Sequence, residues 1–155
     1  MNLERIKRNQ LPSYERRGFF AQEIIGTRLV YFRLKLSGVD ATTLGGVPVD
    51  IPSCLSNIVP KIGGTVFLSS ISGDNVSILD ITTYLGKPCV LMPWSDRFDL
   101  IGKICNNFTI PMVEYCSFST LRSVGLIPFY DEVVSSGGLG LLLREHGRDN
   151  ILLCC

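Results

Sequence analysis

The second half of the sequence, residues 87–155, alternates short apolar runs with longer amphipathic stretches. This alternation limits the choice of fold more than any other feature. The apolar runs predict strands at 88–94, 110–115, 129–134 and 150–154. The stretches between them predict helices at 95–107 and 138–146. Strands that alternate with helices of this length are typical of βαβ units, so we expect a parallel sheet.

The first half continues in the same order. Strands are predicted at 28–36 and 65–71, and helices at 51–62 and 76–85, where apolar residues recur at helical spacing. We therefore predict an α/β domain at residues 28–155, with three αβα layers doubly wound around a mostly parallel sheet. A basic N-terminal arm at residues 1–27 precedes it. The polar residues Arg28, Arg33 and Lys35 indicate that the first strand has an exposed face or lies at an edge.

The composition agrees with a sheet that is buried on both faces. Hydrophobic residues make up 46% of the 155 residues and charged residues 19%, and the mean hydropathy is +0.29. The net charge of +1 gives no general reason to expect a nucleic-acid partner. We find no run of roughly 18 apolar residues that could span a membrane and no apolar signal-peptide core, so we expect the chain to stay in the cytoplasm.

Motifs for metal, cofactor or covalent chemistry are missing from the sequence. The six cysteines lack metal-ligand spacing, and Cys154 and Cys155 are adjacent, which suits neither zinc nor an ordinary disulfide. The single histidine, His146, falls at a predicted helix end, where it would interact with the helix dipole. We therefore expect no cofactor, no metal and no catalysis.

Two loops at the predicted carboxyl edge of the sheet carry the polar residues that could bind a ligand. Free N–H groups and hydroxyls at the start of a helix can bind a carboxylate, and ligands on such sheets bind at the carboxyl ends of the strands. The two loops suit a cleft for a small anionic or zwitterionic ligand, and the same residues also suit plain helix caps. The predicted ligand-binding residues are Trp94, Ser95, Tyr115, Ser117, Ser119 and Thr120.

The order of motifs resembles a receptor family. The segments Leu91-Met-Pro-Trp-Ser95, Thr109-Ile-Pro-Met-Val-Glu-Tyr-Cys-Ser-Phe-Ser119 and Phe129-Tyr-Asp-Glu-Val-Val-Ser-Ser136 are similar to the N-terminal lobe of type I periplasmic-binding-protein folds. Natriuretic-peptide receptors, receptor guanylyl cyclases, class C receptors and glutamate receptors have ectodomains of this kind. The resemblance implies a small-molecule or peptide ligand, held in part by the hydroxyls of Ser95 and Ser117, and an extracellular location.

The same resemblance implies a dimer. In the family the helices of the first lobe make the dimer contact, so residues 51–62 and 76–85 are the expected interface of a homo-oligomer. The family binds its ligands between two lobes, whereas this sequence ends after the first. We therefore expect a non-catalytic binding and dimerisation lobe, a truncated form of the receptor domain.

Three other hypotheses stay open. The first is a cytosolic α/β binding module for a nucleotide or RNA, based on the basic residues within positions 1–17. The second is an enzyme that uses Asp96, Asp99, Glu114 or Asp131, although no spacing selects a reaction. The third is a fragment with no activity of its own.

Overall fold

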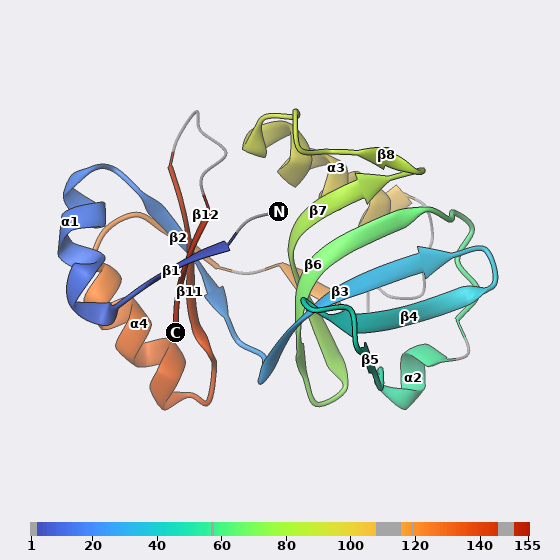
Figure 1. Cartoon of the computed structure of the whole chain (residues 1–155), viewed down its shortest axis with the longest axis horizontal. Coiled ribbons are helices and arrows are strands. Elements are labelled where there is room, and N and C mark those ends of the chain that lie inside the picture. The colour runs from blue at the N-terminus through green and yellow to red at the C-terminus, as the bar shows by residue number, and fades with distance from the viewer. Residues whose placement is uncertain (1–2, 57, 108–115, 119, 146–150) are drawn as a thin grey trace.

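The computed structural model describes residues 3–56, 58–107, 116–118, 120–145 and 151–155. Within these ranges the chain forms two sheets that lie face to face, and helices cover their outer faces (Figure 1). Antiparallel pairing dominates both sheets. The predicted fold class, a doubly wound, mostly parallel αβα sheet forming a single periplasmic-binding-protein lobe, is therefore wrong.

The first sheet, sheet A, has the strand order β1-β12-β11-β2-β10. Its strands are β1 (Leu3–Ile6), β2 (Phe20–Ile24), β10 (Leu121–Arg122), β11 (Gly140–Arg144) and β12 (Ile151–Cys154). Only β1 and β12 pair in parallel among its described strands. The helices η1 (Arg8–Gln10), α1 (Leu11–Arg16) and α4 (Leu126–Ser135) belong to this half, and α1 and α4 pack on the outer face of the sheet (Figure 1).

The second sheet, sheet B, has the order β5-β4-β3-β6-β7-β8. Its strands are β3 (Arg28–Lys35), β4 (Gly38–Thr43), β5 (Pro48–Val49), β6 (Thr65–Ser72), β7 (Asn75–Tyr84) and β8 (Lys87–Pro88). These strands are antiparallel, and β9 (Cys116–Phe118) adds a parallel pairing with β7. The helices α2 (Ser53–Ser56) and α3 (Trp94–Asn107) cover its outer face.

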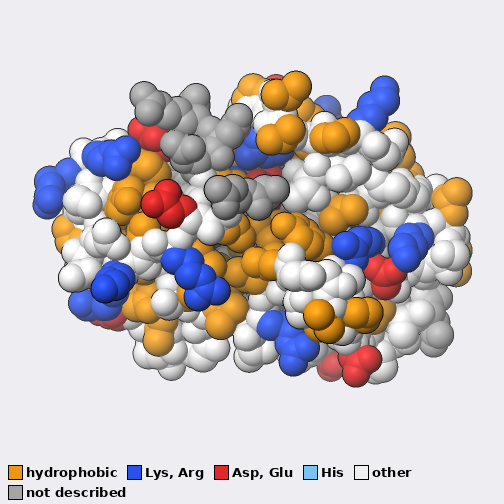
Figure 2. All heavy atoms as spheres, viewed as in Figure 1, with side chains coloured by type: hydrophobic (Ala, Val, Ile, Leu, Met, Phe, Trp, Pro, Cys, Tyr) orange, Lys and Arg blue, Asp and Glu red, His pale blue; other side chains and the backbone are white. Residues whose placement is uncertain are grey.

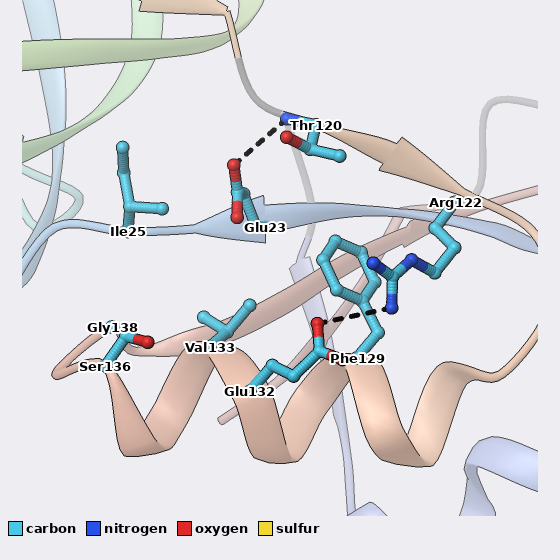
Figure 3. A pocket seen from close by; sticks show the side chains of 9 residues that line it. All are labelled: Glu23, Ile25, Thr120, Arg122, Phe129, Glu132, Val133, Ser136 and Gly138. Atoms are coloured by element: carbon cyan, nitrogen blue, oxygen red, sulfur yellow. Dashed lines mark hydrogen bonds and ion pairs between the residues drawn. The ribbon is translucent and has the colours of Figure 1, made fainter.

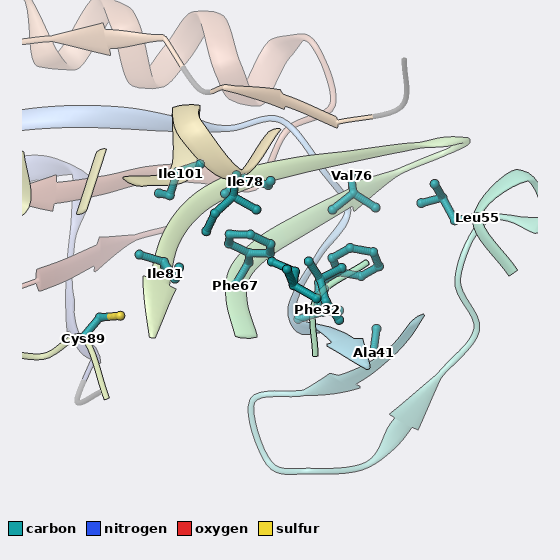
Figure 4. Packing of buried hydrophobic residues seen from close by; sticks show 13 residues of the cluster. Phe32, Ala41, Leu55, Phe67, Val76, Ile78, Ile81, Cys89 and Ile101 are labelled. Atoms are coloured by element: carbon teal, nitrogen blue, oxygen red, sulfur yellow. The ribbon is translucent and has the colours of Figure 1, made fainter. Parts of the chain in front are cut away.

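Three buried clusters hold these layers together. On the outer face of sheet B, Phe32 and Phe67 pack beneath Ile101 of α3 and beside Leu55 of α2 (Figure 4). A second cluster lies between sheet A and helices α1 and α4. The third joins the two sheets through the buried residues Ile24, Leu68, Leu79, Leu142, Ile151 and Leu153. The chain is therefore layered as helix, sheet, sheet, helix, with one more layer than predicted.

Strand β7 shows why the helical prediction at 76–85 is wrong. The pairing of β6 with β7 shifts register twice, so this stretch contains a bulge. Ile78 and Ile81 therefore face α3, while Leu79 faces sheet A. A bulge adds one residue to a strand, so beyond it the alternation of side chains between the two faces of the sheet is shifted by one position. The resulting spacing of three between Ile78 and Ile81 imitates one turn of a helix.

For two further segments the predicted type of secondary structure, helix or strand, is the opposite of the observed one. Residues 140–144, expected to be helical, form β11, whose apolar residues are buried on both faces. Residues 129–134, expected to be extended, belong to α4, which buries Leu126, Phe129 and Val133 against sheet A. The strands at 28–36, 65–71 and 150–154 and the helix at 95–107 are confirmed within one or two residues at each end. The predicted strand at 110–115 lies outside the described residues.

The basic N-terminal segment is part of sheet A rather than a solvated arm. Strand β1 pairs with β12, and Leu11 is fully buried. Arg8 forms a two-pronged pair with Asp131 of α4, with distances of 2.9 and 2.7 Å. Glu15 accepts a hydrogen bond of 2.7 Å from the N–H of Leu126. These contacts fasten the segment to α4.

Gly140 allows β11 to start close against the neighbouring strand. Its φ of +145° is one that residues with side chains rarely adopt, and a Cβ there would lie 2.0 Å from the carbonyl oxygen of Cys154. Glycine is therefore required at this position.

Candidate functional site

A buried ionic cluster joins the two sheets. Asp80 of β7 is fully buried and lies 2.9 Å from Nη1 of Arg144 on β11 and 2.9 Å from Nε of Arg97 on α3. Arg144 also donates to Oε1 of Gln22 at 2.8 Å and to the carbonyl of Leu79 at 3.1 Å. Because each of these buried polar groups has a partner, the cluster ties sheet A, sheet B and α3 together.

Trp94 covers this cluster at the start of α3. The guanidinium carbon of Arg144 lies 3.6 Å from the centre of the indole ring, and that of Arg97 lies 5.6 Å away. Burial lowers the pKa of Arg144 to about 10, and the negative charge of Asp80 opposes this change. Arg144 therefore stays protonated at neutral pH. Trp94, which was predicted to bind a ligand, instead packs against the guanidinium group of Arg144.

The predicted ligand-binding residues lie in different surroundings. Ser95 is exposed in the first turn of α3, beside Trp94. Thr120 lies next to β10 of sheet A, where its N–H donates to Glu23 at 3.3 Å. Ser117 belongs to β9 and pairs with Ser77. Tyr115 and Ser119 lie outside the described residues. Their contacts thus place Trp94 and Thr120 in separate clusters, one between the sheets and one at the edge of sheet A.

The open part of sheet B's inner face carries a gradient from apolar to charged residues. Leu29 and Tyr31 of β3 are half-buried and pack against the cluster between the sheets. Arg33 and Lys35 follow on the same face because side chains alternate along a strand. Figure 2 shows hydrophobic side chains gathered between the two halves of the molecule. The face of β3 therefore offers an apolar surface at one end and two cations at the other.

One carboxylate orients both cations. Asp40 of β4 lies opposite Arg33, at 3.6 Å from Nη1, and also forms an ion pair with Nζ of Lys35. Arg33 also donates a hydrogen bond of 2.9 Å to the hydroxyl of Thr42. The side chains of Arg33 and Lys35 are 32% and 53% exposed, so their remaining N–H groups can reach a ligand. Two cations against one carboxylate leave a local charge of +1.

A cavity of about 240 Å³ lies at the edge of sheet A (Figure 3). Residues from β2, β10, α4 and the segments next to them line it: Glu23, Ile25, Thr120, Arg122, Phe129, Glu132, Val133, Ser136 and Gly138. Thr120 is the one predicted site residue among them. Arg122 lies over the ring of Phe129, with 4.3 Å from its guanidinium carbon to the ring centre, and pairs with Glu132 at 3.4 Å.

The described thiols and carboxylates do not build a metal centre. No group of three or more His, Cys, Asp or Glu residues in the described ranges could hold a metal ion. Cys89, Cys105, Cys154 and Cys155 are free thiols, and burial raises the pKa of both Cys105 and Cys154 to about 11. Among the helices that the structure describes, none is long and apolar enough to cross a membrane.

Two signals for these clusters were present in the sequence. Arg144 ends the run Leu141-Leu-Leu-Arg144, and Asp80 stands between Leu79 and Ile81. A single charge inside a buried apolar run needs a partner of opposite charge, so each of these two residues could have been expected to have such a partner. The alternation of Arg33 and Lys35 with apolar residues correctly indicated an exposed face. However, β3 is a central strand between β4 and β6, not an edge.

Comparison with known proteins shows a similarity of fold alone. No family model and no curated protein matches the chain. Two solved structures, named "Pmar-Lig_Pre." and "Pmar-Lig_PreS3", match 96% of the chain with TM-scores of 0.58 and 0.59, at 9% and 8% sequence identity. The match covers 43% of each of those chains, so this sequence spans less than half of their length.

Proposed function

We propose that this chain is a nucleotide-binding module, with its site on the open inner face of sheet B. The receptor-lobe hypothesis required a doubly wound sheet, whereas the described strands form two mainly antiparallel sheets. It also placed the dimer contact on helices at 51–62 and 76–85. The second of these segments is the inner strand β7, in which Leu79 is fully buried.

The main support for the proposal is the change from apolar to cationic side chains along the inner face of β3. A nucleotide has a flat, weakly polar base at one end and an anionic phosphate chain at the other. Tyr31 and Leu29 supply a half-buried aromatic and aliphatic surface for the base, since aromatic rings stack on bases of any sequence. Arg33 and Lys35 supply the cations for the phosphates, and guanidinium groups match phosphate oxygens in two-pronged hydrogen bonds.

The scaffold supports such a site. Tyr31 and Arg33 lie on a strand that is paired on both sides, opposite Thr42 and Asp40 on β4 and opposite Leu68 and Val66 on β6. The ion pairs to Asp40 restrict the two cations before a ligand arrives. A site whose cations are already restricted loses less conformational entropy on binding.

Isothermal titration calorimetry with ATP, adenosine and tripolyphosphate tests the proposal. We expect ATP to bind with a dissociation constant below about 1 mM and more tightly than either half, because only ATP reaches both ends of the gradient. A charge-assisted hydrogen bond contributes about 1.5–3 kcal/mol. Arg33→Gln should therefore weaken ATP binding by roughly ten- to a hundredfold.

The matched control is Arg28→Gln, which changes the same residue type on the same strand. Arg28 lies on the opposite face of β3, with the parity of Val30 and Phe32, so its loss should leave ATP binding unchanged. Equal losses in the two variants would refute the site. Equal affinity for ATP and tripolyphosphate would refute the base-binding half. The proposal is one of binding without catalysis, so release of phosphate or pyrophosphate from bound ATP would contradict it.

A further inference from the structure

The cavity at the edge of sheet A is separate from the proposed nucleotide site. Glu23 and Ile25 have the parity of Ala21, which faces the helices α1 and α4, whereas Gln22 and Ile24 face sheet B. The cavity therefore opens on the outer face of sheet A, between β2, β10 and α4 (Figure 3). The nucleotide site lies on the inner face of the other sheet.

The lining combines both signs of charge with an apolar wall. Glu23 and Glu132 are carboxylates, and Arg122 is the only cation among the lining residues. The ring of Phe129 holds the guanidinium of Arg122 in place, and its pair with Glu132 at 3.4 Å uses one of its five N–H groups. Ile25, Val133 and Phe129 provide the apolar surface.

We propose that this cavity binds a small zwitterion, an α-amino acid with an aliphatic side chain. The carboxylate of the amino acid pairs with the free N–H groups of Arg122. Its ammonium group lies between the carboxylates of Glu23 and Glu132, and its side chain packs against Ile25 and Val133. The net charge of the lining, −1, disfavours a plain anion, while the rigid guanidinium of Arg122 disfavours a plain cation.

The volume agrees with this class of ligand. A cavity of about 240 Å³ is below the range of about 300–1,000 Å³ that is typical of sites for drug-sized ligands. A free amino acid is small enough for such a cavity. The opening leaves room for solvent at Glu132, whose side chain is 63% exposed, so we expect weak binding in the millimolar range.

Saturation-transfer NMR on the whole chain tests this proposal with leucine, 4-methylpentanoate and isoamylamine as probes. The second probe lacks the ammonium group of leucine, and the third lacks its carboxylate. We expect saturable leucine binding and at least tenfold weaker binding of both analogues. Isoamylamine binding as tight as that of leucine would overturn the proposal, as would the lack of any leucine signal at 50 mM.

Variants locate the site. Arg122→Gln and Glu132→Gln should each weaken leucine binding at least fivefold, while Arg16→Gln on the exposed surface of α1 leaves it unchanged. Thermal unfolding of each variant confirms that it is folded. Leucine binding unaffected in both cavity variants would refute the assignment. Because ATP should bind equally well to all three variants, a failure of this proposal is distinguishable from a failure of the nucleotide site.

Discussion

Replacing Arg144 with methionine should destabilise the protein strongly. Methionine fills a similar volume but removes the ion pair to Asp80 and the hydrogen bonds to Gln22 and to the carbonyl of Leu79. Breaking a buried pair by removing one partner costs about 3–5 kcal/mol. Asp80 keeps Arg97 as a second partner at 2.9 Å, so we expect the low end of this range, about 3 kcal/mol.

Urea unfolding at neutral pH measures this loss. The fluorescence of Trp94, the single tryptophan of the sequence, follows the region of the cluster, and far-UV circular dichroism follows the whole fold. Both probes should report the same lowered midpoint with an unchanged urea dependence. Arg28→Met, a change of the same type at an exposed position of β3, should leave the midpoint where it is. A loss below about 1 kcal/mol in Arg144→Met would show that the cluster does not hold the sheets together.

Three further predictions concern single positions. Gly140→Ala should lower the free energy of urea unfolding by more than about 1 kcal/mol, since alanine is strained at the φ of this position. Gly102→Ala within α3, where a Cβ meets open space, should instead raise it by about 0.5–1 kcal/mol. Equal effects of the two substitutions on stability would contradict the backbone argument. Leu79→Asp should abolish cooperative unfolding rather than dissolve a dimer, because Leu79 is fully buried between the sheets; a folded monomer in size-exclusion chromatography would show an interface residue instead. Iodoacetamide at pH 8 should label exposed Cys155 much faster than Cys105, whose thiol pKa burial raises to about 11, and equal rates in peptide mass mapping would contradict this.

Individual strands were predictable from the sequence, but the arrangement of the sheets was not. The runs at 28–36 and 65–71 contain β-branched and aromatic residues and form strands as predicted. Continuous apolar runs such as Leu141-Leu-Leu143 indicate only that both faces are buried. A strand in a parallel sheet and a strand sandwiched between helices and a second sheet satisfy this condition equally, so the choice between them depends on contacts far apart in the sequence.

For the candidate sites, too, the sequence predicted local properties but not the contacts between distant elements. The alternation at Arg33 and Lys35 correctly predicted an exposed face, because it is a local property of one strand. The partners of Arg144 come from three other elements, β2, β7 and α3, and β10 approaches α4 at the cavity only through the pairing of sheet A. Periodicity within one element does not encode such meetings, and the bulge in β7 also disguised the strand that carries Asp80.

A ¹⁵N–¹H correlation spectrum of the labelled protein during titration with ATP tests the proposed nucleotide site directly. We expect saturable shifts concentrated on the amides of β3 from Tyr31 to Lys35 and of β4 from Asp40 to Thr42, and none at Thr120 or Glu132 beside the cavity. These shifts should vanish in Arg33→Gln and persist in Arg28→Gln. Shifts confined to another surface, or no shifts at millimolar ATP, would contradict the proposed nucleotide site.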